Sequence, residues 1–370
     1  MLATLFGLTH EGRGVKSTFD LGKKIMSWTD IFPVLDEAML ETYQVGVSEA
    51  ERAEFEDWFG VAEVGGQACR LTRPTGCQPL LDREEFVTTR NVPISQHKRD
   101  AYPPHIVSAT LFWKHVNIAD PELPAPTREM LVDAKRMGLV KRFAPWSSYI
   151  EPLLVHSRAA MEKHPHVTFR LYLAADLDFL IPELTELGWE IFLMKSPSIR
   201  YSPGGFWRFL ALEDDALVTV IDTDRMGEVS QEIARTEGMH QMGLGLWRVP
   251  GYYNSDLTHQ VRYRPILGGH FGARGGGIPV RELIECFVWH WRHKTLPNTA
   301  HIPGLGERPI QFSEWPNYGF DEWFQLAALY PRLVERGTLT FIPSDARSLL
   351  LPIDIEYCMW ANSRSEAMYF

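Results

Sequence analysis

Cysteine is scarce in this chain, which has four cysteines in 370 residues. Only Cys69 and Cys77 lie close together in the sequence, and their spacing matches no zinc-binding pattern. So few and so scattered thiols exclude a disulfide-stapled scaffold. A reducing, cytoplasmic setting is therefore the expectation from cysteine usage.

Long apolar runs and an excess of basic residues are also missing. No apolar run reaches the roughly 18 residues that a membrane-spanning helix needs. The apolar residues 1–8 have no basic residues before them, which does not fit a secretory signal peptide. The formal net charge is −10, so the chain gains no long-range attraction to nucleic-acid phosphates. No internal repeat or low-complexity tract is visible.

The composition that remains is that of a globular enzyme, with 45% hydrophobic and 23% charged residues. The breaker Tyr102-Pro103-Pro104 divides two kinds of pattern. Before it, helices are predicted over residues 28–43 and 48–59, followed by a turn-rich piece over 65–90. We therefore expect an accessory region of unknown role over residues 1–100, a main domain over 101–345 and a carboxyl-terminal tail over 346–370.

Predicted strands and helices alternate through the main domain. The strands are apolar along nearly their whole length, which is typical of a parallel sheet covered on both faces. The alternation predicts a doubly wound α/β fold. The predicted strands are residues 105–113, 167–173, 189–194 and 217–221, and the predicted helices are 127–137, 180–187 (closed by Gly188), 205–212 and 280–291.

The strand over residues 217–221 leads directly into Asp222 and Asp224. Side chains alternate along a strand, so at its end these two carboxylates are expected on the same side. Open α/β sheets bind ligands at the carboxyl ends of their strands. Mg²⁺ is held by one or two carboxylates, with phosphates and water completing the coordination. The pattern therefore predicts a divalent ion and a diphosphate at this sheet edge.

Two later segments carry further candidates. Residues 238–277 are rich in glycine and are predicted to be irregular; such glycines let the backbone approach a ligand, although an aromatic-packed surface loop explains them equally well. Residues 318–326 predict the start of a helix with Asp321 and Glu322 in its first turn. A carboxylate there is held ionised and suits a base, whereas helix capping by Asp321 explains the same residues.

Histidines are concentrated in the last third of the chain, which raises the alternative of a zinc enzyme. Their spacings do not repeat a known ligand motif, so this alternative is disfavoured. The histidines are His240, His259, His270, His290, His293 and His301.

These motifs together resemble glycosyltransferases of the GT-A fold. The resemblance rests on their order: an apolar first strand, Trp207-Arg208-Phe209, an acidic turn, a strand ending in Asp-x-Asp, a Leu-Gly-Gly-x-aromatic-Gly-x-Arg segment and a late Tyr-Gly-aromatic-Asp segment. The chain is similar in particular to a group of such proteins with an Arg-Asp-x-Asp-Ser-Arg signature. The resemblance covers residues 105–345. It implies a Rossmann-like, mixed and mostly parallel sheet with helices on both faces, plus an amino-terminal extension.

On the donor side, the resemblance assigns Asp222 and Asp224 to a divalent metal, Mn²⁺ or Mg²⁺. Asp345 is the candidate further ligand, because the late histidine of many such enzymes is missing. Arg208 corresponds to a residue that braces the nucleotide side of the motif, and Thr110 in the first strand is expected beside the donor.

On the acceptor side, the resemblance assigns Gly268, Gly269 and Arg274 to the acceptor loop. Asp321 matches the acid that takes the acceptor's proton, and Glu322 lies beside it as a second catalytic candidate. The sequence departs from the pattern where Ile221 replaces an arginine and where Gln325 is inserted.

The activity implied is transfer of a sugar from a nucleoside-diphosphate sugar to an acceptor hydroxyl. The acceptor is left open among a glycan, a small molecule, a protein and a modified nucleobase, and inversion or retention depends on whether Asp321 reaches it. Two other classes stay open: a metal-dependent nucleotidyltransferase and a non-catalytic module that binds sugar nucleotides.

Overall fold

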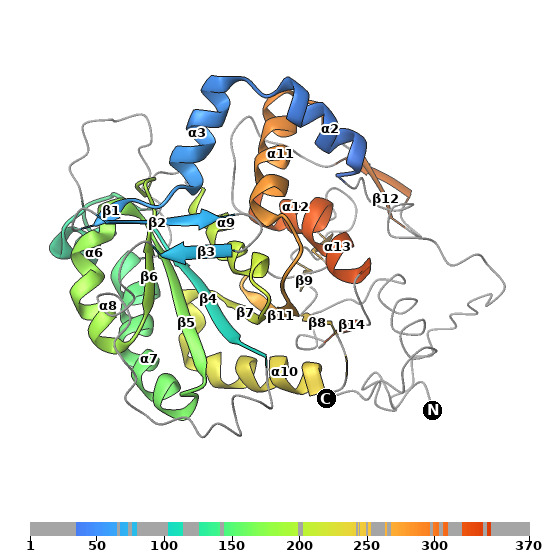
Figure 1. Ribbon diagram of the computed structural model, residues 1–370. Helices are drawn as coiled ribbons and strands as arrows, with labels where there is room; N and C mark the ends of the chain where they lie inside the picture. The colour runs from blue at the N-terminus through green and yellow to red at the C-terminus, as the bar shows by residue number, and fades with distance from the viewer. Residues whose placement is uncertain are drawn as a thin grey trace, which may run out of the picture.

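The main feature of the computed structural model is a mixed seven-stranded sheet in the order β14-β8-β11-β7-β4-β5-β6 (Figure 1). Its strands are β4 (His105–Leu111), β5 (Val167–Leu173), β6 (Glu190–Leu193), β7 (Leu217–Ile221), β8 (Leu246–Arg248), β11 (His270–Arg274) and β14 (Leu339–Phe341). The structure describes residues 35–64, 67–72, 76–79, 103–113, 126–140, 144–198, 203–241, 243, 245–248, 251–252, 263–264, 268–296, 299–302, 306–309, 320–335 and 339–341.

The order of the strands reverses between β4 and β7. From β4 the chain steps outward through β5 to β6 in parallel pairing, and β7 then returns to the other side of β4, also in parallel. Strand β11 runs antiparallel to both β7 and β8, whereas β14 pairs with β8 in parallel. In open α/β sheets such a reversal marks the crevice where ligands bind. Asp222 directly follows β7 at this point.

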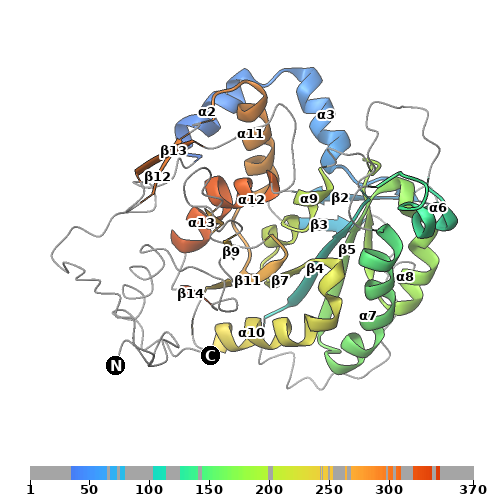
Figure 2. The same cartoon turned by 180° about the vertical axis from the view of Figure 1, so that it is seen from behind.

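Three helices, α7 (Glu151–Lys163), α8 (Ile181–Leu187) and α10 (Val229–Gln241), cover one face of the sheet (Figure 2). Alternation along the strands decides which side chains meet them. His105 contacts the Thr219 hydroxyl, which in turn contacts Thr236 of α10 at 2.7 Å. Trp189 donates to Ser157 of α7 at 2.9 Å.

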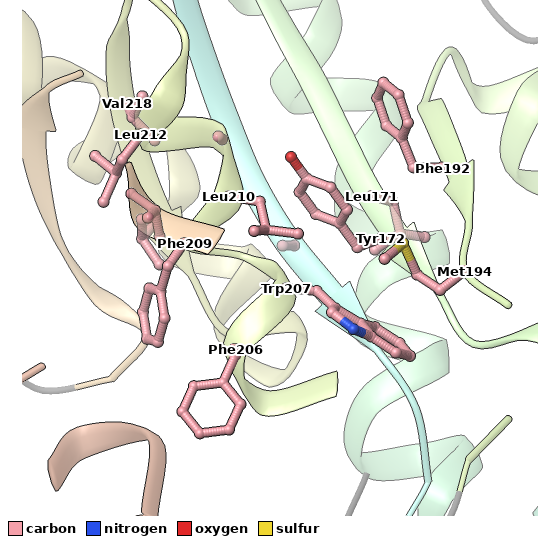
Figure 3. Close-up of a cluster of buried hydrophobic side chains, with 14 of the residues drawn as sticks. Leu171, Tyr172, Phe192, Met194, Phe206, Trp207, Phe209, Leu210, Leu212 and Val218 are labelled. Carbon is pink, nitrogen blue, oxygen red and sulfur yellow. The ribbon is translucent and has the colours of Figure 1, made fainter. Parts of the chain in front are cut away.

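The opposite face carries α9 (Gly204–Trp207) and the short helix η4 (Leu210–Glu213). Figure 3 shows apolar side chains of this segment, among them Trp207 and Phe209, beside Tyr172 of β5 and Val218 of β7. Beyond them lie α11 (Val280–Arg292) and α12 (Phe320–Phe324), joined through tilted and edge-on contacts between aromatic rings. The sheet is therefore buried between two helical layers, and the α/β class is confirmed.

Helices α2 (Glu37–Gly46) and α3 (Glu49–Phe59) pack across α11 (Figure 1). A capping box at the start of α3 explains where that helix begins, because Ser48 binds the Glu51 amide and the Glu51 side chain binds back. The Tyr43 hydroxyl donates to Glu285 at 2.8 Å, and Arg281 donates to Glu56 at 2.7 Å. The expected boundary at residue 100 lies outside the described residues.

Shorter elements complete the structure. No helix within the described ranges is long and apolar enough to cross a membrane. The remaining elements are β1 (Glu63–Val64), β2 (Gln67–Thr72), β3 (Gly76–Pro79), α6 (Arg128–Asp133), η2 (Trp146–Ile150), η3 (Ala175–Leu180), η5 (Thr223–Glu228), β9 (Gly251–Tyr252), β10 (Tyr263–Arg264), β12 (Thr299–Ile302), β13 (Gly306–Pro309), η6 (Gln325–Leu329) and α13 (Tyr330–Glu335).

Several predicted elements are confirmed and others are corrected. The strand over residues 167–173 and the helix ending at Gly188, which takes the left-handed φ of 107° that glycine favours, are as predicted. The predicted helix over 205–212 is instead two short helices, α9 and η4. The stretch 238–277, predicted to be irregular, contains the end of α10 and the strands β8 and β11.

Candidate functional site

Arg208 lies at the centre of the candidate site, where it joins two carboxylates that are far apart in the sequence. Its Nη1 donates to Oδ1 of Asp222, and its Nη2 donates to Oδ2 of Asp321 at 2.5 Å. The arginine side chain is only 8% exposed. Burial by itself lowers the pKa of Arg208, but the charges of Asp222 and Asp321 outweigh it, so the pKa is raised. The arginine therefore stays charged and holds both aspartates in place.

A break in the helical backbone positions Arg208. The hydroxyl of Ser108 donates to the Arg208 carbonyl at 2.7 Å, and the Leu212 amide bonds to the carbonyl of Phe209 at 2.9 Å. The Arg208 carbonyl thus binds the sheet instead of continuing an α-helix, and α9 ends there. This contact also explains why the segment forms two short helices.

Gly268 and Gly269 lie so close to these charged groups that a side chain at either position would force the groups to move. A β-carbon on Gly269 would lie 2.2 Å from Cγ of Asp222, and one on Gly268 would lie 2.6 Å from Nη2 of Arg208. The Gly268 amide also donates to Glu322 at 3.4 Å. Gln325, the inserted residue of the sequence comparison, donates to the Gly268 carbonyl at 3.4 Å and begins a π-helical turn, the form in which a helix accommodates one extra residue.

Asp224 lies in η5, two residues after Asp222. Its side chain reaches solvent, yet partial burial and then the negative charge of Asp222 raise its pKa to about 6. Two carboxylates this close repel each other, and a bound cation relieves that repulsion. Among the residues that the structure describes, no group of three or more His, Cys, Asp or Glu side chains is arranged to hold a metal. The fit is therefore to an ion held by one or two carboxylates, whose other ligands come from phosphate and water.

The other predicted site residues lie apart from Arg208. Thr110 is buried near the carboxyl end of β4, where its hydroxyl donates to the Gly204 carbonyl at 2.8 Å and so supports the start of α9. Arg274 pairs in register with Leu217 at the opposite end of β11, and its side chain is 56% exposed beside Asp215. Asp345 lies outside the described residues.

Two of the late histidines that raised the zinc alternative, His290 and His293, link helices, whereas His259 lies outside the described residues. Both ring nitrogens of His290 are engaged, Nδ1 with Thr295 at 2.7 Å and Nε2 with the Met39 carbonyl at 2.8 Å. His293 contacts Glu51 of α3 at 2.9 Å. These contacts fasten α11 to the helices α2 and α3.

Sequence reasoning missed a group of buried polar residues behind Asp222. Glu232 of α10 is fully buried, and burial raises its pKa to about 7. His270 is the first residue of β11 and pairs with Ile221 of β7. Burial, together with the charges of Arg225 and Arg235, lowers the pKa of His270 to about 3. His270 Nδ1 lies 3.2 Å from Glu232 Oε1. Only the antiparallel pairing of β11 brings them together, so the sequence carried no signal for this contact.

A second titratable cluster lies at the amino-terminal ends of β4 and β5, away from the aspartates. Glu237 of α10 contacts His166 at 2.6 Å, and His105 lies 3.5 Å away. Burial alone raises the pKa of Glu237, but hydrogen bonds from His105 and His166 outweigh it and lower the pKa to about 2. This cluster joins α10 to the sheet.

The structure thus brings together Arg208, Asp222, Asp321, Glu322 and the two glycines, with Asp224 adjacent. Such a set presents carboxylate oxygens and an arginine at the carboxyl ends of the strands, which suits a cation and a phosphorylated ligand. Comparison of the chain with protein-family models, with curated proteins and with solved structures finds no match.

Proposed function

We propose that this protein is a metal-dependent glycosyltransferase of the GT-A type, acting on a nucleoside-diphosphate sugar. The observation that carries the proposal is the position of Asp222 and Asp224, directly after β7 and beside the reversal in strand order between β4 and β7. Ligands of open α/β sheets bind at such a point. The mixed, mostly parallel sheet agrees with the fold that the sequence resemblance implies.

Asp222 and Asp224 are the proposed ligands of Mn²⁺ or Mg²⁺. A metal held there supplies Lewis-acid stabilisation of the negative charge on the departing diphosphate. Arg208 fixes the orientation of Asp222 through Oδ1, and Gly269 lets the start of β11 close over the same carboxylate. The aspartate is thereby held in one position before any ligand arrives.

Asp321 is the proposed base for the acceptor hydroxyl. Arg208 binds its Oδ2, so Oδ1 is the oxygen that would accept the proton. Glu322, on the same helical turn, binds the Gly268 amide and so holds the glycine loop against Asp321. A base on the acceptor side of the sugar gives inversion at the anomeric carbon.

The test is a screen of sugar nucleotides with Mn²⁺ and Mg²⁺ that follows protein unfolding temperature and release of nucleoside diphosphate. A ligand that binds the native state alone raises its stability, so the screen identifies base and sugar together. We expect at least one sugar nucleotide to stabilise the protein and to be turned over.

Two variants and a second substrate class sharpen this test. Asp224→Ala is expected to abolish turnover in a folded protein, and Asp321→Asn to keep donor binding while turnover falls at least about 100-fold. Turnover of nucleoside triphosphates instead would indicate a nucleotidyltransferase. Binding of a sugar nucleotide with neither transfer nor hydrolysis would indicate a binding module.

A further inference from the structure

Arg225 follows Asp224 directly and contacts the buried group behind the site. Its Nη2 lies 3.4 Å from Nε2 of His270 and 2.5 Å from an oxygen of Glu228. The charge of Arg225 also acts on Asp224, where it favours the carboxylate. The arginine is therefore the chain neighbour of the predicted metal ligand and also contacts the His270 ring.

The chemistry of these contacts defines the role of His270. An arginine has no acceptor atom, so His270 Nε2 must accept from Arg225, and the ring proton must be on Nδ1. Nδ1 lies 3.2 Å from Glu232 Oε1, which also accepts from Arg235 at 2.9 Å. The edge-on ring of Trp247, 5.8 Å away, packs beside His270. The His270 ring thus accepts from Arg225 through Nε2, while Nδ1 lies near the buried Glu232 side chain without the geometry of a hydrogen bond.

The carboxylate partner of Arg225 is easily replaced. Glu228 is 51% exposed, and an exposed ion pair of this kind contributes little to stability. Arg208, by contrast, is buried and engaged by two carboxylates. A diphosphate at Asp222 and Asp224 brings negative oxygens to the neighbourhood of Arg225, and arginine binds such oxygens through charge-assisted hydrogen bonds.

We propose that Arg225 binds a phosphate oxygen of the diphosphate, exchanging Glu228 for it, and that His270, which contacts Arg225 through Nε2, is its positioning residue. This inference rests on the proposed function, because it deepens the donor side of the same site. In this proposal Arg225 pairs with the negative charge of the ligand, whereas Arg208 pairs with Asp222 and Asp321 of the protein.

The test measures affinity by calorimetry in the presence of Mn²⁺. The probes are inorganic pyrophosphate and ADP, GDP, UDP and CDP, each diphosphate compared with its own nucleoside. Arg225→Gln should weaken pyrophosphate and the preferred diphosphate about 10- to 100-fold, while nucleoside affinity stays unchanged. Arg225→Lys keeps the charge and loses the planar guanidinium. Its affinity for pyrophosphate and the preferred diphosphate should lie between those of wild type and Arg225→Gln.

The positioning role has its own variants. His270→Leu should weaken diphosphate binding about 10-fold, whereas His270→Gln, whose amide oxygen can replace Nε2 as the acceptor, should restore most of it. The matched control is Arg136→Gln, because Arg136 is an exposed arginine paired three residues away with Asp133 at 2.6 Å, as Arg225 is with Glu228. That variant should bind within about 2-fold of wild type.

The outcomes separate the two proposals. If wild type binds neither pyrophosphate nor any nucleoside diphosphate, the proposed function and this inference both fail. If wild type binds and Arg225→Gln binds equally well, the function stands and the phosphate role of Arg225 is wrong. If Arg225→Gln is weak but His270→Leu matches wild type, His270 has no positioning role. A uniform loss of nucleoside and diphosphate affinity would mean that the residues are merely structural.

Discussion

Replacing Gly269 with alanine tests the geometry on which the candidate site depends. The added β-carbon would lie 2.2 Å from Cγ of Asp222 and 2.4 Å from its Oδ2, whereas ordinary contact begins at 3.4 Å. The two groups would therefore have to separate by about 1 Å. Rotation of the Asp222 side chain would break its ion pair with Arg208, and the bond from the Asp222 amide to the Gly269 carbonyl, at 3.3 Å, keeps the two backbones together.

Gly269→Ala is expected to destabilise the folded protein, because the added methyl group overpacks this contact. Such insertions destabilise proteins by about 1–3 kcal/mol, which at about 2 °C per kcal/mol for a chain of this size lowers the unfolding temperature by roughly 2–6 °C. Because the displaced group is a proposed metal ligand, Mn²⁺-dependent binding of a nucleoside diphosphate should weaken by at least about 10-fold as well. Differential scanning calorimetry and a titration of the same samples measure both effects.

Gly205→Ala is the matched control at the same site. A β-carbon on Gly205 would meet Asp321 at 3.5 Å, an ordinary contact, and alanine favours the helix α9 in which Gly205 lies. We expect unchanged or slightly higher stability and unchanged binding. If Gly269→Ala also unfolds and binds like wild type, the close approach of β11 to Asp222 is refuted.

Two further variants and one pH titration probe the charges. Arg208→Met should lower the free energy of unfolding by about 3 kcal/mol, the low end for a broken buried ion pair, because its partner Asp222 is partly solvated. Partial rescue by Asp321→Asn, which neutralises the less exposed partner, checks the cause in urea unfolding. Glu237→Gln should lower the free energy of unfolding by roughly 2 kcal/mol at pH 7. The pKa of Glu237 is lowered to about 2 in the folded protein, so the stability that this carboxylate contributes is present above pH 4.5 and is lost toward pH 2. The difference between the variant and wild type should therefore vanish at low pH. Mn²⁺-dependent binding should weaken as the pH falls through about 6, where Asp224 takes up a proton, and a pH-independent affinity would argue against its role as a ligand.

Much of the fold could be predicted because local rules agree with the tertiary structure. The strand Val167–Leu173 is mostly apolar and follows Pro165, and the helix Ile181–Leu187 ends at a glycine that takes a left-handed conformation. Asp321 and Glu322 do occupy the first turn of a helix, as their position predicted. In each case the signal lies within a few neighbouring residues.

The strand β11 could not be predicted, because its sequence reflects contacts with distant residues. The glycines in this segment predicted a loop. In the structure, a β-carbon on Gly272 would lie 2.2 Å from Nε1 of Trp247 and 2.3 Å from the Thr236 hydroxyl. Glycine is present in this strand because neighbouring strands and α10 leave no room. The contacts of His270 depend on the same antiparallel pairing, and so they were also beyond sequence reasoning.

The central claim is that Asp222 and Asp224 hold a divalent cation against the leaving diphosphate. The most direct measurement is a calorimetric titration of the preferred nucleoside diphosphate into wild type and Asp224→Asn, each with and without Mn²⁺. The account predicts that Mn²⁺ tightens binding to wild type at least about 10-fold and has no such effect on the folded variant. Metal-independent binding by wild type, or an undiminished Mn²⁺ effect in Asp224→Asn, would contradict it.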